Sequence, residues 1–84
     1  MRIITVQTHS DCVLSIVSDD GRSGFFDVSQ YLEYEAFQKL RNPVEFAKII
    51  NGGYFIEWEC GADLSADTIE AHWKVVSKGR QKSA

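Results

Sequence analysis

The sequence predicts an α+β domain with an antiparallel sheet of about five strands. β-branched residues alternate with polar ones in two segments near the N-terminus. Asp-Gly and Gly-Gly pairs separate further strand-like segments, and a marked helix start follows the second of them. Together these observations predict a three-stranded meander plus a hairpin, with short helical segments and a C-terminal helix packed on the sheet.

The meander is predicted from residues 2–8, 12–18 and 22–28. The first two segments alternate apolar and polar side chains, as strands with one buried face do. The Asp20-Gly21 pair lies before the third segment, where a tight hairpin needs a positive φ that glycine adopts at little steric cost. Three consecutive antiparallel strands follow from this spacing.

Helical spacing replaces strand alternation after residue 28. Apolar residues recur three to five positions apart between residues 31 and 40, and Asn42-Pro43 begins another turn that contains Phe46. Residues 48–51 and 54–60 then flank the Gly52-Gly53 pair, which is typical of a hairpin. Short helical segments are therefore expected to cover one side of the sheet before the last strands.

The C-terminal helix is predicted to begin after Ser65. Its hydroxyl can accept a hydrogen bond from a free amide of the first helical turn. Ile69, Trp73 and Val76 are spaced as one apolar stripe of a helix that would lie on the sheet. We expect residues 1–78 to form a single domain and residues 79–84 to form a basic flexible tail.

The composition is that of an ordinary globular protein, with 44% hydrophobic and 25% charged residues in 84. The sequence contains no apolar run of the roughly 18 residues that a membrane span needs, and its start does not resemble a secretion signal. Cys12 and Cys60 are too few for a disulfide scaffold and are expected to be reduced. A cytoplasmic location is predicted.

Charge is distributed unevenly along the chain. Residues 1–73 contain all 12 carboxylates against 5 basic side chains, a net charge of −7, whereas residues 74–84 carry +4. An acidic body repels nucleic-acid phosphates and suits a basic protein partner. Nucleic acid is therefore not expected to bind the core, although the basic tail could contact it.

No catalytic, cofactor-binding or metal-binding residue is predicted. The sequence lacks a nucleophile elbow, a phosphate-binding loop and metal-ligand spacing. Glu57 and Glu59 share one face of a predicted strand, which is compatible with a paired-carboxylate site but is more typical of a solvated face. A pocket that held Glu57 together with His72 would favour an enzyme.

The sequence has more aromatic residues than one small core is expected to bury. Most are expected in the core, with Phe26, Tyr34 or Phe55 left on the opposite sheet face. With Glu57 and Glu59 they are the candidate partner-binding residues. The same surface could support a homodimer, since an open sheet leaves an edge that must be protected.

One set of motifs resembles a known family, domain of unknown function family 2442. It comprises Phe26-Asp27-Val28 after a hairpin, Asn42-Pro43 with Phe46, and Ile56-Glu57-Trp58 before Gly61-Ala62-Asp63-Leu64-Ser65. The resemblance covers roughly residues 3–73 and contains no catalytic motif. Its structural motif residues are Asp27, Pro43, Phe46, Trp58, Gly61, Ala62, Asp63, Leu64 and Ser65.

The resemblance implies a small bacterial or phage protein, often encoded beside a member of domain of unknown function family 4160 in an arrangement proposed to be toxin and antitoxin. The leading hypothesis is a non-enzymatic interaction module, antitoxin-like or inhibitory, whose acidic and aromatic surface occludes a basic site on a protein partner. The alternative is an accessory nucleic-acid-associated regulator that uses the basic C-terminal tail.

Overall fold

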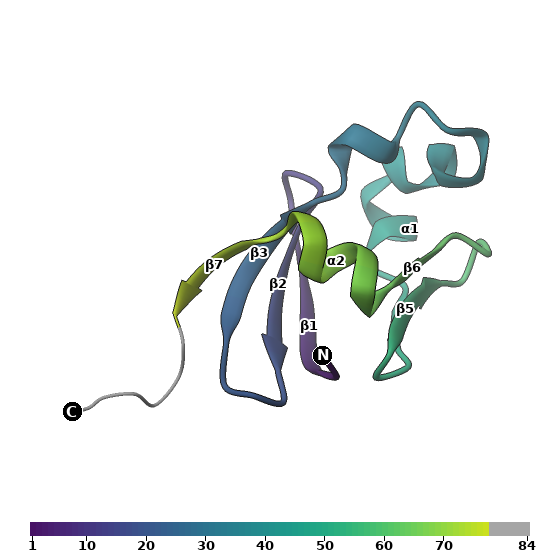
Figure 1. Cartoon of the computed structure of the whole chain (residues 1–84). Coiled ribbons are helices and arrows are strands. Elements are labelled where there is room, and N and C mark those ends of the chain that lie inside the picture. The colour runs from purple at the N-terminus through teal and green to yellow at the C-terminus, as the bar shows by residue number, and fades with distance from the viewer. Residues whose placement is uncertain (78–84) are drawn as a thin grey trace.

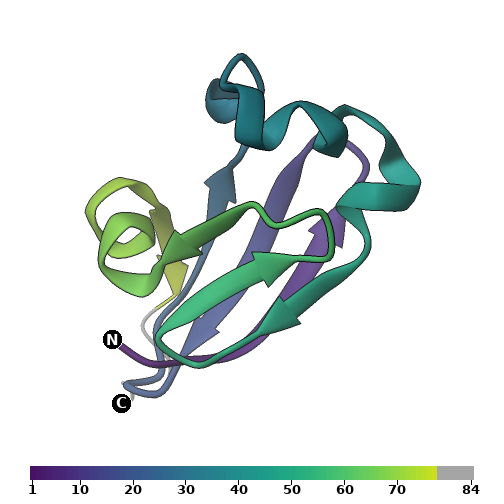
Figure 2. The same ribbon diagram turned by 90° about the vertical axis from the view of Figure 1, so that its right-hand side faces the viewer.

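Two antiparallel sheets face each other in the computed structural model, which describes residues 1–77 (Figures 1 and 2). The first sheet has the strand order β1-β2-β3-β7 and the second has the order β4-β5-β6. The strands are β1 (Ile3–His9), β2 (Val13–Ser18), β3 (Ser23–Asp27), β4 (Ile49–Asn51), β5 (Phe55–Trp58), β6 (Asp63–Ser65) and β7 (Lys74–Ser77). The predicted α+β class is confirmed.

The predicted single sheet of about five strands is wrong, because the described residues form seven strands in two sheets. The meander of β1, β2 and β3 and the hairpin of β4 and β5 are both present. β6 is only three residues long, too short for alternation to reveal it. β7 follows a helix and returns to pair with β3, a long-range contact that local sequence does not encode.

The core lies between the two sheets. Alternation along the meander directs Leu14, Ile16 and Phe26 inward, and all three are buried. Gly21, with φ of 89°, makes the predicted turn between β2 and β3. Ile56 on β5 closes the core from the second sheet.

Three short helical segments cover one end of the two sheets, as Figure 2 shows. They are η1 (Ser29–Tyr31), η2 (Glu35–Arg41) and α1 (Pro43–Phe46). The Asn42 side chain caps α1 by accepting a 2.9 Å hydrogen bond from the Val44 amide, and Pro43 occupies the first helical position. The predicted turn at this site is confirmed.

Trp58 joins this helical cap to the second sheet. Its indole N–H donates a buried 2.9 Å hydrogen bond to the carbonyl of Phe46, and the two rings stack with centroids 5.9 Å apart. Phe37 also meets the indole edge-on, with ring centroids 6.2 Å apart. Because a buried indole N–H needs a partner, this bond fixes where α1 lies relative to β5.

The last helix, α2 (Ala66–His72), begins as predicted. The Ser65 hydroxyl accepts a 3.0 Å hydrogen bond from the Thr68 amide. The expectation that the helix continues to residue 78 is wrong, because Trp73 is extended and the chain then enters β7. Val75 and Val76 are β-branched and favour strand, so the apparent helical stripe through Val76 does not form.

The predicted tail, residues 79–84, lies outside the described residues, as does Lys78 at the end of the predicted helix. Within the described part of the chain, every helix is too short or too polar to cross a bilayer.

The two sheets join at one corner. The Ile3 amide donates a 2.6 Å hydrogen bond to the carbonyl of Gly53, in the β4–β5 turn. The Asn51 amide group also donates to the carbonyls of Ile3 and Ile4. β1 and β4 are thereby held together, while α2 spans the opposite side between β6 and β7 (Figure 1).

Gly24 is the position where β7 comes closest to β3. A Cβ added there would overlap the backbone carbonyl of Lys74 and press on the Trp73 ring at 3.0 Å. Glycine at this position therefore permits the pairing of Gly24 with Val75.

Gly24→Ala should destabilise the protein by about 1–3 kcal/mol, since backbone must move to relieve the overlap. Hydrogen exchange should show the loss first at the β7 amides. Ser23→Ala is the matched control on the same strand and should change the free energy of unfolding by less than about 0.5 kcal/mol. Unchanged β7 protection in Gly24→Ala would contradict the packing described here.

Candidate functional site

The outer face of the second sheet gathers exposed apolar and acidic side chains. Burial of Ile56 and Trp58 on β5 forces the alternate residues, Phe55 and Glu57, to point away from the core. The pairing of β5 with its neighbours places Glu57 opposite Ile50 on β4 and opposite Asp63 on β6. We call Ile50, Phe55, Glu57 and Asp63 the acidic face.

Glu57 and Asp63 are like charges directly opposite each other on neighbouring strands. Such a pair is destabilising unless a cation compensates it. Among residues 1–77, no basic group lies within ion-pair distance of either carboxylate, and neither side chain accepts a hydrogen bond. Ile50 beside them is 56% exposed. The acidic face therefore combines uncompensated negative charge with exposed apolar surface.

The carboxylates of Asp20 and Glu70 are compensated, in contrast. Arg22 bonds Asp20 at 2.8 Å and Glu70 at 2.6 Å, and its guanidinium lies 5.4 Å from the centre of the Trp73 ring. The N-terminal amine is a further 3.3 Å partner of Glu70. This cluster holds the β2–β3 turn against α2, so its charges serve the fold.

The same contacts shift the pKa values of this cluster. The Ser18 hydroxyl, followed by the Arg22 amide, lowers the pKa of Asp20 below 3.8. Hydrogen bonds from Arg22 and from the N-terminal amine lower the pKa of Glu70 below 4.5. Glu70 in turn raises the pKa of Arg22.

Glu59 is also partly compensated. Lys48 lies 3.3 Å from Glu59 and 3.4 Å from Glu45, and these two carboxylates raise the pKa of Lys48, Glu59 having the larger effect. The pairs are exposed and contribute little to stability. Glu59 thus adds less free negative charge to this side of the molecule than Glu57 does.

The predicted partner-binding residues do not all come together. Phe55 and Glu57 lie on the acidic face, and Glu59 follows them at the end of β5. Tyr34 is exposed but belongs to the segment between η1 and η2, at the helical end of the molecule (Figure 2). Ile50 and Asp63 belong to the acidic face but were not predicted to bind a partner.

Phe26 is a correction. It was expected on an outer face, but it is fully buried opposite Leu14 and stacks on Tyr31 at 5.9 Å. The alternation that directs Phe26 inward turns its neighbour Phe25 outward. In a pair of adjacent phenylalanines, only the register with β2 decides which one is exposed.

The motif residues have structural roles, with one exception. Asp27 accepts hydrogen bonds from the Ser29 amide and hydroxyl at the start of η1, and Gly61 adopts φ of 102° at the bend before β6. Two others begin helices, Pro43 in α1 and Ser65 before α2. The remaining four are buried in the core: Phe46, Trp58, Ala62 and Leu64. Asp63 is exposed, and its side chain forms no ion pair or hydrogen bond within residues 1–77.

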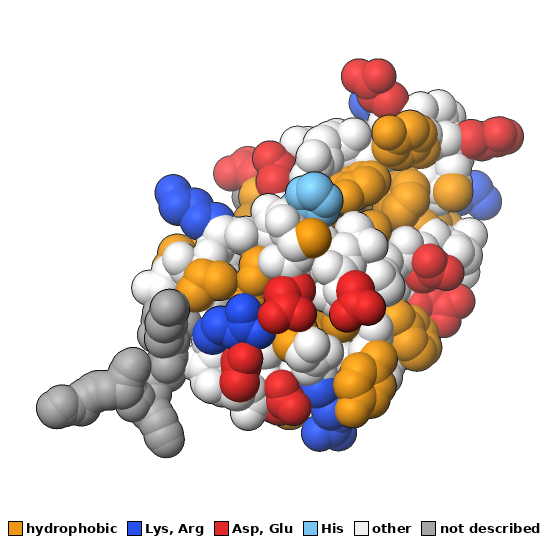
Figure 3. Space-filling model, viewed as in Figure 1, with side chains coloured by type: hydrophobic (Ala, Val, Ile, Leu, Met, Phe, Trp, Pro, Cys, Tyr) orange, Lys and Arg blue, Asp and Glu red, His pale blue; other side chains and the backbone are white. Residues whose placement is uncertain are grey.

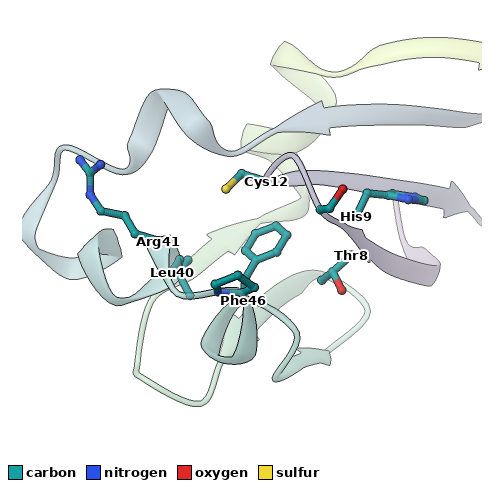
Figure 4. Close-up of a pocket in the computed structure, with 8 residues that line it drawn as sticks. Thr8, His9, Cys12, Leu40, Arg41 and Phe46 are labelled. Atoms are coloured by element: carbon teal, nitrogen blue, oxygen red, sulfur yellow. The ribbon is translucent and has the colours of Figure 1, made fainter.

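A cavity of about 200 Å³ lies between the β1–β2 turn and the helical cap (Figure 4). Cys12 and Phe46 point into it from opposite sides, while the guanidinium of Arg41 and the ring of His9 point away. Small-molecule sites usually occupy about 300–1,000 Å³, so this cavity is small for one. Neither Glu57 nor His72 lines it.

Within the described part of the chain, no three His, Cys, Asp or Glu side chains converge to hold a metal ion. His72 is exposed at the end of α2. Cys12 and Cys60 are free and half-buried against the core. In Figure 3, carboxylates are spread over the surface between apolar patches.

The two facing sheets and the acidic face define a small α+β protein with a candidate protein-binding surface. The chain belongs to the family described as Protein of unknown function (DUF2442), whose family model matches residues 3–75. The resemblance inferred from the motifs is confirmed. Comparison with curated proteins and with solved structures gives no match.

Stability should fall at acidic pH through the Arg22 cluster. The pKa values of Asp20 and Glu70 are lowered in the folded state from ordinary values of 3.8 and 4.5. The contribution of these two groups to the free energy of unfolding is therefore fully present above the unfolded-state pKa values, and it is lost as pH falls through the folded-state pKa values. The stability difference between wild type and Arg22→Met should therefore shrink between about pH 5 and pH 2 in urea unfolding.

Arg41→Met is the control for this experiment. The Arg41 guanidinium donates to the carbonyl of Leu32 and forms no ion pair within residues 1–77. The urea unfolding midpoint of Arg41→Met should change with pH as that of the wild type does. A difference between wild type and Arg22→Met that stays constant down to pH 2 would contradict the assignment.

Glu57→Gln should stabilise the protein by roughly 0.2–1 kcal/mol at neutral pH and low salt, because it removes a like-charge pair from adjacent strands. Glu59→Gln, the control, should give no gain because it also removes the partner of Lys48. Urea unfolding at low and high salt would measure both effects. A Glu57→Gln variant that is less stable than wild type would contradict the claim that the carboxylate pair is uncompensated.

Proposed function

We propose that this protein is a non-enzymatic binding module whose acidic face takes a basic segment of a protein partner. The observation that carries the proposal is the Glu57–Asp63 pair, two carboxylates opposed on adjacent strands without a cation among residues 1–77. Bringing a cation between them would relieve their repulsion. A lysine or arginine side chain of a partner is the natural source of that charge.

The flanks of the pair indicate how such a partner would be held. Ile50 lies opposite Glu57 and Phe55 lies two residues before Glu57 on β5, so both offer exposed apolar surface beside the carboxylates. Interfaces place aromatic and aliphatic anchors beside charged pairs that become desolvated on binding. A basic residue next to an apolar one would match both features of the acidic face.

The rigid framework supports the same proposal. Glu57 and Asp63 project from strands whose alternate residues, Ile56 and Leu64, are buried in the core. The backbone that carries the two carboxylates is therefore fixed before a partner arrives, which reduces the entropy lost on binding. The net charge of the body would also steer a basic partner toward the protein and speed association.

Occlusion is the mechanism that follows. By covering a basic site on its target, the module would prevent that site from binding nucleic acid or another polyanion, as an antitoxin or inhibitor does. Catalysis forms no part of the proposal, and the carboxylates act here only through their charge.

The test is affinity capture with the tagged protein at low and high salt, followed by quantitative mass spectrometry. Glu57→Gln combined with Asp63→Asn should weaken capture of the specific partner by about 10- to 100-fold, and high salt should weaken the wild-type interaction in the same direction. In a titration, the isolated partner should then bind the wild type more tightly than it binds this double variant.

Asp11→Asn combined with Glu33→Gln is the matched control. It removes the same net charge from two exposed carboxylates outside the acidic face. Capture should change by less than about threefold, which separates local contact from loss of overall charge. Equal losses in both double variants, or partners that bind equally well at high salt, would overturn the proposal.

A further inference from the structure

The side chain of Phe55 rests on Gly52 where the β4–β5 turn begins. The Gly52 amide donates a 2.8 Å hydrogen bond to the carbonyl of Phe55, so the two residues lie opposite each other. A Cβ added to Gly52 would overlap three carbons at the far end of the Phe55 ring. The ring therefore fills the space above the glycine, and it is still 43% exposed. Gly52 holds one part of the ring, and the rest of the ring faces solvent.

The strand register places this ring beside the uncompensated carboxylates. Phe55 and Glu57 are alternate residues of β5, so they lie on the same side of the sheet, which faces the viewer in Figure 2. Asp63 lies opposite Glu57 on β6. In a sheet, such neighbours have Cα atoms about 5–7 Å apart. Because the ring extends toward Gly52, on the β4 side, it leaves the two carboxylates uncovered.

The same three parts occur elsewhere in this protein, where an arginine joins them. Arg22 bonds the carboxylate of Asp20 at 2.8 Å and that of Glu70 at 2.6 Å. Its guanidinium also lies 5.4 Å from the centre of the Trp73 ring. One planar cation thus neutralises two carboxylates and packs on an aromatic ring. The acidic face has two carboxylates and a ring, but within residues 1–77 no cation pairs with them or lies over the ring.

We propose that the basic side chain taken by the acidic face is an arginine, and that the Phe55 ring, positioned by Gly52, selects arginine over lysine. This inference rests on the proposed function, because it names the side chain that the same surface binds. A guanidinium is planar, presents its N–H donors in a rigid fork and stacks on aromatic faces. An arginine would therefore bond the carboxylates while it packs on the ring. The ammonium of lysine is a compact, strongly hydrated charge and gains less from the ring.

Gly52 is a positioning residue in this arrangement, since it acts through Phe55. Its φ is not positive, in contrast to Gly53 in the same turn, so alanine at position 52 fits the backbone. Only the Phe55 ring must then move. Gly52→Ala should therefore displace the ring without lowering the urea unfolding midpoint of the protein.

Titration with two short peptides of equal charge, followed in NMR spectra at low salt, tests the proposal. The probes are acetyl-Leu-Arg-Leu-amide and acetyl-Leu-Lys-Leu-amide. The arginine peptide should bind about 3- to 10-fold more tightly, with a Kd of about 1–10 mM, and should shift the amide signals of Phe55, Glu57 and Asp63. The uncharged citrulline analogue is the control and should not bind. Equal affinities for arginine and lysine, or no binding of either peptide up to about 20 mM, would overturn the inference.

Two variants test the role of the ring. Gly52→Ala and Phe55→Leu should each reduce the preference for the arginine peptide to less than about twofold, with the affinity for the lysine peptide nearly unchanged. The combined variant should lose no more than either alone, because both changes act through the same ring. Additive losses would overturn the positioning role of Gly52. Tyr34→Leu, which alters an exposed aromatic residue outside the acidic face, is the matched control and should keep the preference.

The arginine inference and the proposed function can fail separately. Glu57→Gln combined with Asp63→Asn should abolish binding of both charged peptides. If it does so, but the wild type binds the two peptides equally, the basic partner is supported and the arginine inference is overturned. If Asp11→Asn combined with Glu33→Gln weakens both peptides as much, the acidic face is not the binding surface and both proposals are overturned.

Discussion

The burial of Trp58, with its indole N–H bonded to the carbonyl of Phe46, is the interaction on which the remaining structure depends. It fixes the helical cap on the second sheet, and it also fixes which residues of β5 point inward. With Trp58 inside, Glu57 must face solvent. Loss of the ring would leave a large cavity and an unpaired carbonyl, which would cost about 3–5 kcal/mol.

The two outer faces differ because the two sheets use their carboxylates differently. In the first sheet the acidic residues lie mainly in turns, where Asp20 bonds Arg22 and supports the packing of α2. In the second sheet Glu57 and Asp63 lie within strands and oppose each other without compensation. Charge at turns stabilises the fold, whereas charge on the acidic face has no compensating cation within residues 1–77.

Much of the architecture follows from short-range signals. The turn at Gly21, the helical turn at Pro43 and the cap at Ser65 were all predictable because each depends on local chemistry. The same reasoning failed for Val76, whose spacing from Ile69 is helical although it lies on a strand. Pairing with β3 overrides the local pattern there, since Gly24 leaves room for the strand to approach.

The sequence by itself determined the family, the α+β class, the acidic body and two residues of the acidic face, Phe55 and Glu57. Only the tertiary structure decided that Asp63 faces Glu57 and that Phe25, not Phe26, is exposed. The physical reason is register: one residue of shift in strand pairing exchanges the two faces of a sheet, and register depends on contacts between distant segments.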